Sequence, residues 1–167
     1  KRLGAVSHQT LEQLKELTTA DMTHKYWRVI PVSFNASFFP MLKEEANKIL
    51  EKNGIVLKEK YIFHIGSDLP RKNRKLLVDL VKSIDEKWKG KVIFAGHAIT
   101  NDVLPHAKSL GVEDKIISIV KPNHQVLLAL YSNAEALIFP SFSEGFGWPA
   151  IEAQACGTPV IASNRPP

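Results

Sequence analysis

The residues best suited to chemistry lie in the stretch 140–153, where two glutamates flank a pair of glycines. Glu144 and Glu152 stand eight residues apart, and Gly145 and Gly147 lie between them. Carboxylates accept hydrogen bonds from hydroxyl groups, and glycine allows the backbone to approach a ligand closely. The pattern therefore favours a binding site for a ligand that carries hydroxyl groups.

The same stretch also predicts an anion site. It follows an apolar run at 136–139 and opens a helical pattern at 149–156, so it lies at the carboxyl end of a predicted strand, where open α/β sheets bind ligands. Pro149 suits the first helical position. The backbone N–H groups from Gly147 to Ala150, beside the positive end of the helix dipole, would then favour a phosphate group.

A second candidate site is the basic run Arg71-Lys72-Asn73-Arg74-Lys75, at the start of a predicted helix. Cations at a helix start oppose the helix dipole by about 0.3 to 1 kcal/mol each. A bound diphosphate would offset this cost through charge-assisted hydrogen bonds. We therefore expect Lys72, and with it Arg71, to bind a diphosphate. The alternative is a set of solvated surface cations.

Short apolar runs alternate with longer amphipathic segments, and this alternation predicts a Rossmann-like α/β fold with a parallel sheet covered by helices on both faces. The expected strands are 61–65, 92–95, 116–120, 136–139 and 159–162, and the expected helices are 71–88, 101–110, 124–131 and 149–156. The pattern upstream is weaker, with strands at 5–7 and 27–32 and helices at 10–17 and about 40–53. The sequence stops directly after a predicted buried strand, so we expect a domain that is truncated at both ends.

Composition limits the class of protein. The chain has 167 residues, 44% of them apolar, which suits one globular domain of ordinary size. No apolar run is long enough to span a bilayer. A single cysteine cannot form an internal disulfide, which favours a reducing cytoplasmic location. The formal charge of +5 is spread among mixed signs and does not favour nucleic acid as a partner. The six histidines show no metal-ligand spacing, so we expect no metal site.

The whole run 140–163 resembles the donor-site signature of family 4 of the retaining glycosyltransferases, also called glycosyl transferases group 1. The similarity extends to Phe63–Gly66 and Arg71–Asn73, and more loosely to Val6–Ser7 and Val29–Val32. These enzymes have the GT-B fold of two Rossmann-like domains, of which the C-terminal one binds a nucleotide sugar. The resemblance implies that residues 1–40 end the N-terminal domain and form the crossover. Residues 41–167 would then form an incomplete C-terminal nucleotide-sugar-binding domain.

The resemblance also implies roles for single residues. Glu144 would contact the donor sugar near the reacting centre, and Glu152 would bind the ribose hydroxyl groups. Lys72 would neutralise the diphosphate. The other implied donor-binding positions are Gly66, Gly145, Phe146, Gly147, Trp148, Pro149, Val120 and Lys121, the last two beside the nucleotide base. Family members often carry an arginine directly after the glycine that matches Gly66, whereas this chain has Ser67, so Arg71 is the candidate substitute.

The implied function is transfer of a sugar from a UDP- or GDP-linked donor to a hydroxyl acceptor such as a lipid-linked glycan or a polysaccharide, with retention and without a metal or other cofactor. By analogy with the family, the protein would contact the inner face of the membrane peripherally. We expect the fragment alone to be inactive. One alternative remains open because of Ser67: a non-catalytic nucleotide-binding or assembly module with the same fold. Epimerases and phosphorylases of similar architecture are a third possibility, although the glutamate pair favours transfer.

Overall fold

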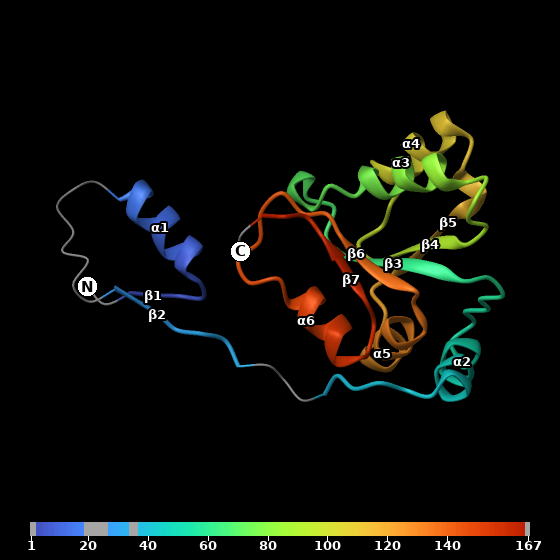
Figure 1. Cartoon of the computed structure of the whole chain (residues 1–167), viewed down its shortest axis with the longest axis horizontal. Helices are drawn as coiled ribbons and strands as arrows, with labels where there is room; N and C mark the ends of the chain where they lie inside the picture. The colour runs from blue at the N-terminus through green and yellow to red at the C-terminus, as the bar shows by residue number, and fades with distance from the viewer. Residues whose placement is uncertain (1–2, 19–26, 34–36, 166–167) are drawn as a thin grey trace.

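The computed structural model describes residues 3–18, 27–33 and 37–165 (Figure 1). Its main feature is a five-stranded parallel sheet with the strand order β5-β4-β3-β6-β7. The strands are β3 (Tyr61–Gly66), β4 (Lys91–Gly96), β5 (Ile116–Val120), β6 (Ala136–Phe139) and β7 (Val160–Ala162). The predicted parallel α/β architecture is confirmed.

Helices cover both faces of this sheet, because its central strands are apolar on both sides. One face carries α3 (Lys75–Ile84) and α4 (Val103–Leu110), and the other carries α2 (Lys43–Lys52), α5 (His124–Asn133) and α6 (Trp148–Ala155) (Figure 1). Every residue of β6 is buried. The two layers hold the carboxyl ends of β3 and β6 side by side, and the loops that follow these strands form the candidate site.

A smaller unit precedes the sheet. It consists of the parallel pair β1 (Leu3–Ala5) and β2 (Trp27–Val29) with α1 (His8–Leu17) packed against it. The Ser7 hydroxyl caps α1 by accepting a hydrogen bond from the Thr10 N–H at 3.2 Å. β1 lies two residues earlier than the predicted strand 5–7, β2 is shorter than the predicted strand 27–32, and α1 begins two residues earlier than expected. The domain boundary near residue 40 stays a prediction.

The predicted helix 71–88 is wrong at both ends. Arg71 and Lys72 belong to a separate 3-10 turn (Pro70–Lys72), and α3 runs only from Lys75 to Ile84. The break comes from Asn73, whose φ of 51° is left-handed and cannot continue a helix. The expected clash of Arg71 and Lys72 with a helix dipole therefore does not arise.

Two features of the described residues concern membrane and metal binding. Within residues 3–18, 27–33 and 37–165, no helix is both long and apolar enough to cross a membrane. The same residues contain no group of three or more histidine, cysteine, aspartate or glutamate side chains placed to hold a metal ion.

Candidate functional site

The candidate site is formed by two loops that are tied together at the carboxyl ends of β3 and β6. The Phe142 N–H donates to the Arg71 carbonyl at 2.8 Å, and the Asn73 side-chain amide donates to the Pro140 carbonyl at 3.3 Å. β3 and β6 are neighbours in a parallel sheet, so both loops leave the same edge. The turn after β3 is thereby held beside the loop after β6.

Glu144 joins the two loops through ion pairs. Its carboxylate accepts from the Lys72 ammonium at 2.6 Å and from the Arg71 guanidinium at 2.9 Å. Arg71 also donates to the Ser143 carbonyl at 2.9 Å. The Glu144 and Lys72 side chains are only 13% and 9% exposed, which makes this a partly desolvated ion pair. The structure thus brings together three residues that the sequence analysis placed in one site.

The electrostatics of this cluster leave an excess of positive charge. Burial tends to raise the pKa of Glu144, but the hydrogen bonds from Lys72 and Arg71 outweigh it and hold the pKa below its usual value. Glu144 is therefore ionised and neutralises one of the two cations. The Lys72 ammonium also lies 5.4 Å from the centre of the Phe139 ring, and its carbon chain passes Gly66 so closely that an added Cβ there would lie 3.5 Å from it. The cluster therefore keeps one uncompensated positive charge, although both cations contact the Glu144 carboxylate.

The start of α6 differs in detail from the prediction. The helix begins at Trp148, with Gly147 as its N-cap, so Pro149 is the second helical residue and not the first. The φ of 87° at Gly147 is left-handed, which explains a glycine here. The Ala150 N–H donates to the Gly147 carbonyl at 3.0 Å and is not free to bind a phosphate, as the sequence analysis expected.

The predicted lining residues beside Glu144 form part of a small cavity of about 190 Å³. Phe146 and Gly147 line it, whereas Lys72 and Glu152 do not. The ring centroids of Phe146 and Trp148 lie 4.9 Å apart, so the two rings pack against one another. Gly145 is exposed, and a Cβ at Gly145 would lie 3.8 Å from the Val6 side chain. The smaller N-terminal unit therefore borders this loop.

Glu152 belongs to a different hydrogen-bond network. It lies on α6, and its Oε2 accepts from the Tyr131 hydroxyl of α5 at 2.8 Å. Burial raises the pKa of Glu152, and the bond from Tyr131 opposes part of that rise. No hydrogen bond or ion pair between described residues joins Glu152 to Glu144 or Lys72. The sequence analysis placed both carboxylates around one anion pocket, and the structure gives them separate partners.

Val120 and Lys121 lie at the end of β5, which is separated from β6 by β4 and β3. Val120 is 54% exposed, and Lys121 has a left-handed φ of 48°. The Lys121 N–H donates to the Gly96 carbonyl at 2.9 Å, which fixes the backbone at this edge. Their predicted contact with a nucleotide base stays a prediction.

Comparison with known proteins adds what the geometry leaves open. Residues 45–167 match the family described as glycosyl transferases group 1. The chain belongs to this family. A glycosyltransferase of Methanocaldococcus jannaschii named MJ1607, itself uncharacterized, is 32% identical over 122 residues, which is 72% of this chain and 31% of that protein. The O-antigen chain mannosyltransferase RfbU of Salmonella typhimurium is 32% identical over 109 residues, or 65% of this chain and 31% of that protein.

This group 1 glycosyltransferase chain thus spans about a third of the length of those two relatives. Among solved structures, HepE of Anabaena in complex with UDP and glucose is similar with a TM-score of 0.81 and 18% identity, over 98% of this chain and 44% of that one. At that identity the likeness concerns the fold. It agrees with the GT-B arrangement that the sequence analysis expected.

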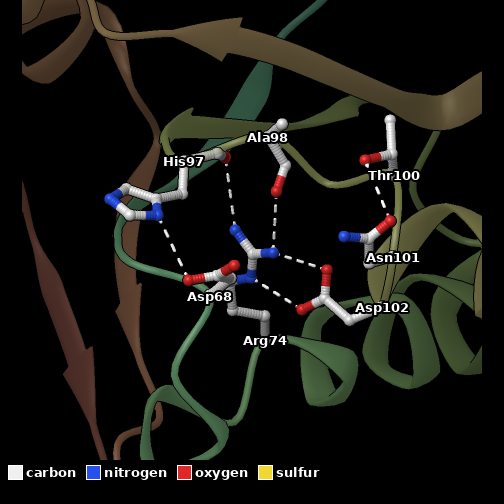
Figure 2. A network of polar contacts seen from close by, with 7 residues as sticks. All are labelled: Asp68, Arg74, His97, Ala98, Thr100, Asn101 and Asp102. Carbon is white, nitrogen blue, oxygen red and sulfur yellow. Dashed lines mark hydrogen bonds and ion pairs between the residues drawn. The ribbon is translucent and has the colours of Figure 1, made fainter.

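Sequence reasoning missed the role of Arg74 in this glycosyltransferase chain. Its buried guanidinium donates to both Asp102 oxygens at 2.8 and 2.5 Å, and to the carbonyls of His97 at 3.2 Å and Ala98 at 2.9 Å (Figure 2). Arg74 therefore holds the loop after β4 against the start of α3 and is occupied within the protein. Nothing in the basic run distinguished this arginine from its neighbours.

His64 of β3 was also missed as part of the site's support. It is fully buried, and its Nδ1 lies 3.1 Å from the Ile138 carbonyl. Its Nε2 has no hydrogen-bond partner among the described residues. Burial is the main cause that lowers the pKa of His64 to about 4, and the nearby Lys72 and Arg74 charges lower it further. The imidazole is therefore neutral near pH 7, where a second buried cation would repel Lys72.

Proposed function

We propose that this chain is the donor-binding part of a retaining glycosyltransferase that uses a UDP- or GDP-linked sugar. The observation that carries the proposal is the convergence of Lys72 and Arg71 on Glu144 at the carboxyl edge of the sheet. Such a cluster offers charge-assisted hydrogen bonds to a diphosphate and a carboxylate for sugar hydroxyl groups. The family match supports glycosyl transfer, and the UDP bound by HepE supports a nucleotide donor.

In the proposed reaction the bond between the anomeric carbon and the diphosphate oxygen breaks, and its electron pair stays on the diphosphate. The acceptor oxygen forms a new bond to the anomeric carbon on the same face, and the acceptor's hydroxyl proton passes to the departing diphosphate. Lys72 and Arg71 neutralise the growing negative charge, which lowers the barrier. Glu144, released from these cations, accepts a hydrogen bond from a sugar hydroxyl. The chain's own cations serve the diphosphate without a metal.

The acceptor belongs to the same proposal. RfbU acts on an O-antigen chain by its name, and a lipid-linked glycan or polysaccharide with a free hydroxyl fits this chain by analogy. Such an acceptor would bring the enzyme to the inner face of the membrane. Residues 41–167 would then hold the donor, with a preceding domain covering the acceptor side. The 167-residue chain alone would transfer little or no sugar.

Calorimetry tests the diphosphate site directly. The chain should bind UDP or GDP more tightly than the matching monophosphate, and Lys72→Met should reduce that preference by about tenfold or more, since it removes a hydrogen bond between charged groups. The control is Lys75→Met, an exposed lysine on the same stretch. An unchanged preference in Lys72→Met, or an equal loss in Lys75→Met, contradicts the proposed site.

Ser67 keeps the non-catalytic module as a second candidate, because it replaces the arginine expected beside Gly66. Turnover by the full-length protein separates the two. Donor hydrolysis or transfer that is abolished by Glu144→Gln supports the enzyme. Tight nucleotide binding without any turnover supports the module.

A further inference from the structure

We infer that Tyr131 is a positioning residue that sets the selectivity of the site for ribose, by holding the Glu152 carboxylate in place. The inference rests on the proposed function, in which Glu152 binds the ribose hydroxyl groups. The Tyr131 hydroxyl donates to Glu152 Oε2 at 2.8 Å and joins α5 to α6. The two residues lie 21 positions apart in the sequence, so the contact exists only in the folded domain.

Tyr131 is held rigidly enough to act in this way. The side chain is fully buried, and its ring meets Phe63 edge-on with 5.0 Å between the centroids. The Tyr131 carbonyl accepts from the Thr158 hydroxyl at 2.5 Å, which fixes the backbone from the other side. Packing and hydrogen bonding therefore leave the phenol a single orientation, and a buried phenol needs a partner for its proton. Glu152 is that partner.

The same bond prepares Glu152 for a ligand. Because Oε2 is occupied by the phenol, the carboxylate has a fixed orientation, while Oε1 has no hydrogen-bond donor among the described residues. Burial alone would favour the protonated acid, whereas the phenol's hydrogen bond favours the ionised form. A carboxylate with one occupied and one open oxygen is suited to accept from the ribose hydroxyl groups.

The consequence concerns selectivity between nucleotides. Without the phenol, Glu152 can turn its carboxylate towards water and lose the geometry that the ribose hydroxyl groups need. A ligand without those hydroxyl groups gains nothing from that geometry. Tyr131 should therefore affect binding of a ribonucleotide and leave binding of a dideoxynucleotide almost unchanged. A tyrosine that only packs the core would affect both nucleotides alike.

The test compares Tyr131→Phe with the parent by calorimetry, using UDP or GDP, whichever the parent binds, and its 2′,3′-dideoxy counterpart. We expect Tyr131→Phe to weaken ribonucleotide binding by about five- to tenfold and dideoxynucleotide binding by less than about twofold. Tyr61→Phe is the matched control. It also removes a buried phenol hydroxyl that bonds to α5, through the Leu130 carbonyl at 2.8 Å, and it leaves Glu152 untouched. Tyr61→Phe should preserve the preference for ribose.

A double-mutant cycle locates the effect. In a Glu152→Ala background, Tyr131→Phe should cause no further loss of ribonucleotide affinity, because the group it positions is gone. Equal losses for both nucleotides in Tyr131→Phe, or additive losses with Glu152→Ala, overturn the inference. A parent that binds neither nucleotide overturns the proposed function and the inference together. A parent that prefers ribose, with a Tyr131→Phe variant that keeps the full preference, overturns the inference alone.

A measurement on the parent keeps the inference testable if Tyr131→Phe does not fold. The chain has three tyrosines, so a ¹³C label on the phenol carbon gives few resonances. The Tyr131 resonance should shift when the ribonucleotide binds and shift much less with the dideoxynucleotide. Equal shifts with both nucleotides overturn the inference.

Discussion

Lowering the pH should destabilise the fold through His64, and the size of the effect follows from its burial. The imidazole has no exposed surface, and burial is the largest cause that lowers its pKa to about 4. In the unfolded chain the same group would have an ordinary pKa of about 6.5. Between these two values the unfolded chain binds a proton that the folded chain does not, so acid favours the unfolded state.

The magnitude can be worked from that difference. A gap of about 2.5 pKa units corresponds to about 3 kcal/mol of folding stability, all of which is lost once the pH is below both values. Between about pH 7 and about pH 5, the part contributed by His64 is about 2 kcal/mol. Protonation of carboxylates whose pKa is lowered in the fold, such as Glu144, also reduces the stability of the fold at low pH. A substitution at His64 is therefore needed to isolate its share.

His64→Leu supplies that comparison. It removes the titrating group and also the hydrogen bond to the Ile138 carbonyl, so it should lower stability near pH 7 by about 1 kcal/mol. The loss between about pH 7 and about pH 5 should nevertheless be about 2 kcal/mol smaller than in the parent. Urea unfolding at both pH values, followed by tryptophan fluorescence, measures the difference.

The control is His97→Gln, at a histidine whose side chain is 56% exposed and which lies at the end of β4. It should leave the pH dependence of unfolding as steep as in the parent. If His64→Leu loses as much stability as the parent on acidification, burial of His64 does not govern its protonation, and the reasoning fails.

Three further predictions concern the support of the site. Gly96→Ala should destabilise the fold by about 1 to 3 kcal/mol in urea unfolding, because φ is 105° and the new Cβ would lie 2.7 Å from the Gly66 carbonyl oxygen; an unchanged midpoint would contradict this. Arg74→Met should cost about 3 kcal/mol in the same assay, since it leaves Asp102 and two carbonyls without their donor, and a neutral effect would show that the contact is not needed. Burial raises the pKa of the Cys156 thiol to about 11, so an aromatic disulfide reagent near neutral pH should modify the folded chain about a hundredfold more slowly than the urea-unfolded chain; equal rates would refute the burial.

The parts of this structure that could be predicted from sequence are those that local chemistry decides. The central strands β3, β4 and β6 are short, mainly apolar runs, and burial on both faces leaves a strand little other choice of residues. Gly145, Gly147 and Pro149 predict that the loop after β6 leads into a helix. In a parallel sheet this loop then lies beside the loop after β3. The meeting of Glu144 with Lys72 follows from these steps, although the residues lie 72 positions apart.

The parts that could not be predicted depend on contacts that have no local signal. Asn73 takes a left-handed φ while its side chain donates to the Pro140 carbonyl, and the predicted helix therefore begins later than expected. In the sequence Arg74 is indistinguishable from its basic neighbours, and only the fold brings it into contact with Asp102, 28 positions away. Tyr131 looked like a core aromatic residue, and only the packing of α5 against α6 shows that its hydroxyl meets Glu152.

The pairing of Glu144 with two cations has a consequence for how a donor could enter. Two cations held near each other in a partly buried site repel and lose hydration, and a carboxylate between them offsets both costs while the site has no ligand. In the proposed donor complex a diphosphate would have to displace that carboxylate, so its net gain in affinity would be smaller than its contacts with Lys72 suggest. The displaced Glu144 would then be available to the sugar, whereas Glu152 would keep its bond to Tyr131. Diphosphate recognition should therefore weaken steeply with salt, and ribose recognition should not, because only the first depends on exchanging ion pairs.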